Sequence, residues 1–291
     1  SEPMFMRTFS IEQTKLMRRA LPWILLSVLA GATLLITGIN YLVMNNSLGS
    51  NLGTEMTAEV RRQVTWPDGL FSAISIAGGS ALGGLLVVIL SGTTMAQEYT
   101  WRTLQQWLGR GVPRPVFLAA KFAALLLPIL LMVLVPLLVG GLLTGLITIG
   151  VEGRLGAGDV AWSSLALRTL ATAYSLLPYA ALTFLIAVAT RSTVAAVGIG
   201  VAYALLVEGL VLQLASFFSE SLARLSLYLP AGLAQSLLQS ERLVQVSVDG
   251  RPITGGAELL SPAVAVAGIA VYTVLFLAAA IAIFRRQDLN E

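Results

Sequence analysis

Residues 96–115 read AQEYTWRTLQQWLGRGVPRP and lie between two strongly apolar runs. The run before them, 71–95, has no charged residue, and the run after them, 116–149, has only Lys121. Each run is long enough to cross about 30 Å of hydrocarbon at a rise of about 1.5 Å per residue. The polar stretch therefore separates two predicted membrane spans.

Composition supports the same class of protein. Of 291 residues, 56% are hydrophobic and 11% are charged, whereas roughly a quarter of the residues in a soluble domain are charged. The sequence predicts an all-α, polytopic membrane protein with six transmembrane helices in a single domain, residues 1–291. The predicted spans are 23–43, 71–95, 116–149, 165–190, 192–214 and 262–284.

The distribution of lysine and arginine predicts the orientation, because these residues are enriched in cytoplasmic loops. One side of the predicted membrane domain holds Arg7, Lys15, Arg18, Arg19, Arg102, Arg110, Arg114, Lys121, Arg191, Arg285 and Arg286. The other side holds Arg61, Arg62, Arg154, Arg168, Arg224, Arg242 and Arg251, spread over longer loops. Both termini and residues 97–114 are therefore expected to be cytoplasmic.

Two further segments have patterns of their own. Residues 4–19 place Phe5 and Phe9 on one helical face, which predicts an amphipathic helix at the inner membrane surface. A solvated basic tail is the alternative. The predicted external segment 215–261 combines helical spacing with a hairpin signal at Asp249-Gly250.

Several kinds of chemistry are excluded by residues that the chain lacks. It contains no cysteine and no histidine, which excludes thiolate catalysis, histidine-based triads and metal sites built from these residues. No stretch matches the phosphate-binding loop GxxxxGK[ST], so the chain is not expected to be an ATPase itself. Metal sites and cofactors on this chain are not expected.

Glu208 is the one ionisable residue deep in a predicted span, and Gln213 lies near it. Ionisable residues inside spans often contact a substrate or ion. A carboxyl group hydrogen-bonded to neighbouring helices is the structural alternative, and the sequence leaves both open.

The stretch 97–114 itself predicts a short amphipathic helix that ends in a Gly/Pro turn. Its residues resemble permease subunits of type-2 ABC transporters, the export class. That family has an acid after the second span, a threonine and leucines, a Pro-x-Arg turn and a lysine that enters the third span. The matching residues are Glu98, Thr103, Leu104, Leu108, Arg114 between Pro113 and Pro115, and Lys121, with a basic-Asp-aliphatic end at Arg285, Arg286, Asp288 and Leu289.

The resemblance implies that residues 97–114 form a coupling helix docked on a separate ABC ATPase subunit, present in two copies, which binds ATP and magnesium. The implied coupling residues are Glu98, Trp101, Arg102, Leu104, Trp107, Leu108, Arg110 and Arg114. A second permease, identical or related, and membrane lipid would be the other partners, with no nucleic acid. The implied location is a bacterial or archaeal plasma membrane.

The expected function is export of a hydrophobic or amphipathic substrate, driven by ATP hydrolysis on the partner subunit. Two alternatives remain. An ion-coupled secondary transporter would rest on Glu208, and a non-catalytic scaffold subunit of a membrane complex would need none of the predicted site residues.

Overall fold

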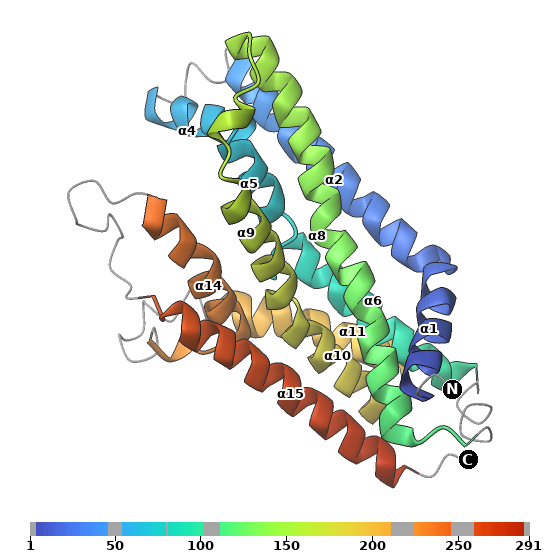
Figure 1. Ribbon diagram of the computed structural model, residues 1–291. Helices are drawn as coiled ribbons and strands as arrows, with labels where there is room; N and C mark the ends of the chain where they lie inside the picture. Colours follow the sequence, from blue (N-terminus) through green and yellow to red (C-terminus); the bar gives the residue numbers. More distant parts are fainter. Residues whose placement is uncertain are drawn as a thin grey trace.

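The computed structural model describes residues 4–45, 54–79, 81–101, 111–210, 224–245 and 259–287. Every element in these residues is helical, as predicted (Figure 1). The helices are α1 (Met4–Met17), α2 (Ala20–Asn45), α4 (Thr54–Val64), α5 (Asp68–Ser75), α6 (Leu82–Thr100), α8 (Arg114–Glu152), η1 (Ala157–Asp159), α9 (Trp162–Ser175), α10 (Leu177–Thr190), α11 (Thr193–Ala202), η2 (Tyr203–Glu208), α14 (Pro230–Gln245) and α15 (Pro262–Arg286). The predicted hairpin around Asp249-Gly250 lies outside the described residues.

Four segments of the described chain are long and apolar enough to cross a membrane: Ala20–Asn45, Arg114–Glu152, Trp162–Thr190 and Pro262–Arg286. They coincide with four of the six predicted spans. Ser261 caps the last of them, because its hydroxyl accepts a hydrogen bond from the backbone N–H of Val264.

The predicted span 71–95 is not one helix. It is divided between α5 and α6, with a turn between Ser75 and Leu82. A side chain at Gly83 would place its Cβ 2.1 Å from the carbonyl oxygen of Ala77, so the chain can fold back this closely only at glycine. The glycines of IAGGSALGG serve two purposes: Gly83 allows the break within the span, and Gly79 packs closely on Tyr179 of α10.

The predicted span 192–214 also differs from a regular helix. The α-helix α11 covers its first part, and the wider turns of the π-helix η2 follow from Tyr203 to Glu208. Two residues join α10 to α11: Arg191, in the left-handed conformation, and Ser192, whose hydroxyl caps α11. The tight helical connection predicted at this position is therefore confirmed, and residues 211–214 lie outside the described chain.

The core forms around α10, which packs against α6, α11 and α15 (Figure 1). Its residues Ala180, Phe184 and Ala187 are fully buried. The broken pair α5 and α6 follows α8 closely: Gly69 in α5 packs on Thr144 of α8, and Glu98 in α6 reaches Lys121. From Lys121 to Thr144, α8 rises by roughly 35 Å.

Helix α14 lies alongside α15 and α9. Leu233 of α14 packs so closely on Gly268 that a Cβ there would come within 2.7 Å of a leucine methyl carbon. Arg168 of α9 is buried and donates to the backbone carbonyl of Leu238 at 2.8 Å. Side-chain packing and a polar contact therefore hold α14 against the helical body.

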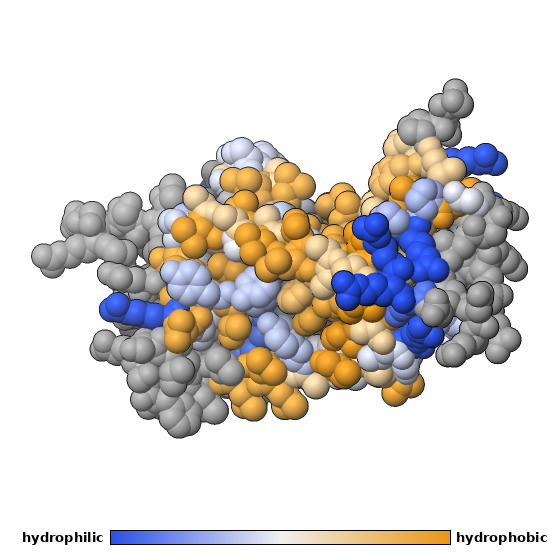
Figure 2. Space-filling view, turned by 90° about the horizontal axis from the view of Figure 1, so that it is seen from below, coloured by the Kyte–Doolittle hydropathy of each residue, from blue (hydrophilic) through white to orange (hydrophobic). Residues whose placement is uncertain are grey.

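Viewed from below, hydrophilic residues gather in a patch on the right (Figure 2), the side on which Figure 1 places both termini. The surface next to this patch is largely apolar.

Candidate functional site

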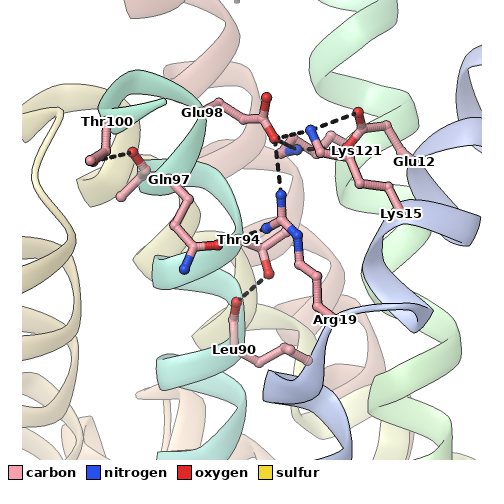
Figure 3. Close-up of polar contacts among 10 residues, drawn as sticks. Glu12, Lys15, Arg19, Leu90, Thr94, Gln97, Glu98, Thr100 and Lys121 are labelled. Carbon is pink, nitrogen blue, oxygen red and sulfur yellow. Dashed lines mark hydrogen bonds and ion pairs between the residues drawn. The ribbon is translucent and has the colours of Figure 1, made fainter. Parts of the chain in front are cut away.

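A buried cluster of charged side chains joins α1, α6 and α8 at the end of the molecule where the termini lie (Figure 3). Glu98 is 0% exposed, Lys121 is 1% exposed and Glu12 is 3% exposed. The Lys121 ammonium group donates to Glu98 Oε1 at 2.8 Å and to Glu12 Oε2 at 2.6 Å. One lysine therefore links two acids that come from different helices.

Two further cations, one in α1 and one just beyond its end, approach the same carboxylate. Lys15 Nζ donates to Glu98 Oε1 at 2.5 Å, and Arg19 Nη2 lies 3.7 Å from that oxygen. Arg19 also donates to Gln97 Oε1 at 2.7 Å. Three cations thus surround the carboxylates of Glu98 and Glu12, so each buried acid lies beside compensating positive charge.

The spacing along α1 explains how it reaches the cluster. Glu12, Lys15 and Arg19 are three and four residues apart, so their side chains project from the same face of the helix or its end. That face, with buried Thr8 and Leu16, packs against α8. The structure has a helix at Met4–Met17, and the face that carries Glu12 and Lys15 packs on α8. The predicted position of its apolar face at the inner membrane surface stays a prediction.

The apolar side chains of α1 do not all share this buried face. Phe5 is exposed and stacks on Phe9, with ring centroids 6.4 Å apart. The ionic partners on α6 and α8 explain this orientation, because a charge buried without its partners would cost far more than an exposed phenyl ring.

A second polar contact, centred on Arg114, fixes the start of α8. Its Nη1 donates to three backbone carbonyl oxygens at the end of α15: Phe284 at 3.1 Å, Arg285 at 3.0 Å and Gln287 at 2.8 Å. The last carbonyls of a helix lack partners within that helix and carry partial negative charge, so a guanidinium group is a suitable cap.

Gln287, just after α15, extends this contact to two more helices. Its Oε1 accepts a hydrogen bond from the Tyr99 hydroxyl at 2.8 Å, and its Nε2 donates to the carbonyl of Val188 in α10 at 2.7 Å. Tyr99 lies beyond the predicted span 71–95, and burial raises the pKa of its phenol, so the hydroxyl stays protonated and donates.

These contacts bear on the predicted coupling segment 97–114. Glu98 is buried inside the protein, so its side chain anchors α6 rather than meeting another subunit. Trp101 is 54% exposed and stacks beneath the Arg19 guanidinium, 4.7 Å from the ring centroid. The predicted coupling residues Arg102, Leu104, Trp107, Leu108 and Arg110 lie outside the described residues.

The structure therefore shows both flanks of residues 102–110 held in place. Glu98 and Tyr99 hold the end of α6, and Arg114 holds the beginning of α8. The flanks are attached to α1, α10 and α15 as well as to each other. A displacement applied to the segment would have to move these helices, because polar contacts at both ends resist a local change.

The second predicted site, Glu208, lies at the end of η2 and is 2% exposed. Its Oε2 accepts a hydrogen bond from the Tyr179 hydroxyl at 2.5 Å, and its Oε1 accepts one from the backbone N–H of Ala231 at 3.3 Å. Ala231 lies in the first turn of α14, where backbone N–H groups have no partner within the helix and stabilise a nearby carboxyl group.

Glu208 thus joins α10, η2 and α14, and each carboxyl oxygen has a protein partner. The arrangement matches the structural alternative that the sequence left open. Gln213, predicted beside it, lies outside the described residues.

Sequence reasoning missed several members of both sites. Glu12, Gln287 and Tyr179 were not singled out, since each acts through a partner far away in the chain. A usable signal was present only in α1, where an acid and two bases recur at helical spacing just before an apolar run.

Comparison with known proteins gives a family and no closer relative. No curated protein matches this chain. A family model described as a protein of unknown function (DUF2705) matches residues 34–290, which include Glu98, Lys121, Glu208 and Gln287. On the extent of that match, the chain belongs to the DUF2705 family.

Proposed function

We propose that this chain is the transmembrane subunit of an ATP-driven ABC exporter, and that residues 97–114 are its coupling segment. The observation that carries the proposal is the anchoring of both flanks of that segment, by the ionic cluster at Glu98 and by the carbonyl contacts of Arg114. A segment that receives a push from an ATPase needs rigid attachment to the helices it moves.

The break between α5 and α6 is compatible with six crossings. These two helices together follow α8 over a rise of roughly 35 Å, which exceeds the roughly 30 Å of a hydrocarbon core. We propose that they cross the membrane as one interrupted span, and that α11 with η2 forms the fifth crossing. Both termini would then be cytoplasmic, in a plasma membrane.

The proposed mechanism divides the work between subunits. Two separate ATPase subunits would bind ATP and magnesium, close on each other and displace the coupling segments of two permeases. The ionic cluster and the Gln287 contacts would pass this displacement to α1, α8, α10 and α15 as rigid bodies. The apolar make-up of the spans suits a hydrophobic or amphipathic substrate.

Glu208 supports the main alternative, an ion-coupled transporter, less well. Both carboxyl oxygens accept hydrogen bonds from the protein itself, from Tyr179 and from Ala231. These bonds to α10 and α14 are those expected of a carboxyl group with a structural role.

The test is affinity purification of the full chain from its native membrane in mild detergent, followed by mass spectrometry and an ATPase assay. We expect a stoichiometric ATPase partner with vanadate-sensitive hydrolysis. Recovery of the chain alone, without hydrolysis, would overturn the proposal and favour the ion-coupled alternative or the scaffold.

Two tryptophans allow a matched control. Trp101 and Trp162 are similarly exposed, at 54% and 56%, and Trp162 lies at the start of α9, beyond the far end of α8. Trp101→Ala should reduce the ATPase recovered per chain, because exposed tryptophans are frequent hot spots in interfaces. Trp162→Ala should leave it unchanged. Equal recovery in both variants would argue against docking at Trp101.

A further inference from the structure

An apolar groove lies between α8 and α15, in the half of these helices nearer to Arg114. It has a volume of about 170 Å³ and is partly open at the surface. Its walls include Leu118, Phe122, Ala123 and Leu126 of α8 and Leu277 and Ile281 of α15. An apolar cavity of about 150 Å³ accommodates benzene, so this groove has room for roughly six carbons of a hydrocarbon chain.

Cationic side chains lie where the groove approaches the end of both helices. Arg285 follows Ile281 by four residues, on the same side of α15 and about 6 Å further along its axis. On α8, Arg114 precedes Leu118 by four residues. The apolar groove therefore ends next to guanidinium groups that the two helices contribute.

These arginines differ from the cations of the buried cluster. Arg285 and Arg286 are exposed, and neither takes part in an ion pair among the described residues. Arg114 donates from Nη1 to three backbone carbonyl groups. None of these three partners is a carboxylate, so these contacts do not neutralise its charge. Among the described residues, the end of the groove thus carries positive charge that no carboxylate pairs with.

We propose that the groove binds an anionic phospholipid of the cytoplasmic leaflet, with one acyl chain against Phe122 and Ile281 and the headgroup phosphate at Arg285 and Arg286. Each part of this ligand meets a surface that suits it. The walls are apolar where the chain lies in hydrocarbon, and guanidinium groups bind phosphate through paired, charge-assisted hydrogen bonds. Basic sites between helices at the cytoplasmic surface recognise anionic headgroups in this way.

Charge selects this occupant over others. A zwitterionic lipid has the same phosphate but also a cationic group, which the arginines repel. A second copy of this chain would bring the same two arginines to the interface, so like charges would oppose contact at this end. Lipid binding at this groove does not depend on the proposed transport function.

The experiment uses the purified full chain in detergent with equal amounts of dioleoyl phosphatidylglycerol and dioleoyl phosphatidylcholine, and native mass spectrometry counts the lipids retained. The wild-type chain should retain the anionic lipid with a preference of about 30-fold, the size expected from two arginines near a membrane surface. Combined Arg285→Gln and Arg286→Gln should remove this preference and leave a residual binding without charge selectivity.

The matched control is the combined change of Arg7→Gln and Arg18→Gln. Both residues are exposed on or beside α1, and the change removes the same amount of charge away from the groove. It should leave the preference at its wild-type value. If both double variants lose the preference for the anionic lipid, or if both keep it, the assignment of the headgroup site is wrong.

Ala123→Phe tests the chain-binding part of the site, because the larger ring would fill the groove. It should reduce retention of both lipids, and circular dichroism and gel filtration report whether the variant folds. If it does not fold, the exposed arginine variants still decide the outcome. The chain has no cysteine, so Ile281→Cys would be a unique site, and efficient oxidative cross-linking through it would show a second copy in the groove and overturn the proposal.

Discussion

Replacement of Glu98 by glutamine tests the ionic cluster on which the proposed coupling depends. The change keeps the shape of the side chain but removes the charge that Lys121 approaches to 2.8 Å and Lys15 to 2.5 Å. Lys121 would retain Glu12 as its acidic partner, at 2.6 Å. Three cations would then face one carboxylate instead of two.

The structure sets the size of the expected effect. At 2.8 Å, the attraction between Glu98 and Lys121 is about 6 kcal/mol with an effective dielectric constant of about 20, and the cost of taking both groups out of water offsets much of it. Removal of one member of a buried pair usually costs about 3–5 kcal/mol. Because Glu12 still compensates Lys121, we expect Glu98→Gln to lower the free energy of unfolding by about 3 kcal/mol, at the low end of that range.

The assay is denaturant unfolding in mixed micelles, followed by circular dichroism, for single and double variants. Lys121→Met alone should also destabilise the chain, since it leaves two buried carboxylates with fewer partners. The double variant Glu98→Gln with Lys121→Met should lose at least about 1 kcal/mol less than the sum of the single losses, because the two groups contact each other.

An exposed acid supplies the control. Glu59 lies on the surface of α4, and Glu59→Gln should change the free energy of unfolding by no more than about 0.5 kcal/mol. If Glu98→Gln is as mild as this control, or if the effects of Glu98→Gln and Lys121→Met simply add, the buried cluster does not hold α6 to α8 and the anchoring argument fails.

Three other predictions test separate parts of the fold. Gly83→Ala should destabilise the chain by several kcal/mol, through overpacking against backbone, whereas Gly31→Ala in the open middle of α2 should stabilise it by up to about 1 kcal/mol in thermal unfolding. Glu208→Gln alone should lower the free energy of unfolding less than the double variant Glu208→Gln with Tyr179→Phe, because an amide oxygen still accepts the hydrogen bond of the tyrosine hydroxyl. A large loss of stability from Glu208→Gln alone, or an altered pH profile of transport, would indicate an ionic role. Gln287→Ala should speed amide hydrogen exchange in the last turn of α6, and unchanged exchange there would show that this glutamine does not fix it.

Sequence reasoning succeeded where local composition controls structure. The long apolar runs predicted α2, α8 and α15, since a helix is the only way to satisfy the backbone of a single apolar segment in a membrane. The turn at Arg191 was also predicted, because one charged residue interrupts two apolar runs and no room remains for a longer loop.

The division of 71–95 into two helices could not be derived in this way. The same apolar sequence with glycines is compatible with two structures, because glycines allow either close approach of two helices or a turn of the chain. The outcome depends on contacts with distant residues. Gly79, for example, packs against the Tyr179 ring, where a Cβ would come within 2.7 Å of a ring carbon.

The ionic cluster was hidden for a related reason. Glu98 and Lys121 attracted notice separately, as an acid after a span and a lysine entering the next. Their partner Glu12 lies more than a hundred residues from Lys121 along the chain, and no local pattern indicates which face of α1 turns inward. The apolar pattern of residues 4–19 predicts a contact with the membrane surface, whereas the long-range ion pairs determine which face of α1 packs on α8.

Contacts between the helices connect the two candidate sites. Helix α6 carries Glu98 at its end, and its Gly92 packs on Thr183 of α10 so closely that a Cβ would come within 2.8 Å. The same helix α10 carries Tyr179, whose hydroxyl holds Glu208 beside the first turn of α14. In the proposed mechanism, a displacement of α6 would press on α10, and the Glu208 contact gives α10 one connection to α14, which also packs on α9 and α15. Under the proposed function, loss of the Glu208 contact should leave ATPase docking intact while uncoupling hydrolysis from transport, whereas loss of Glu98 should impair both.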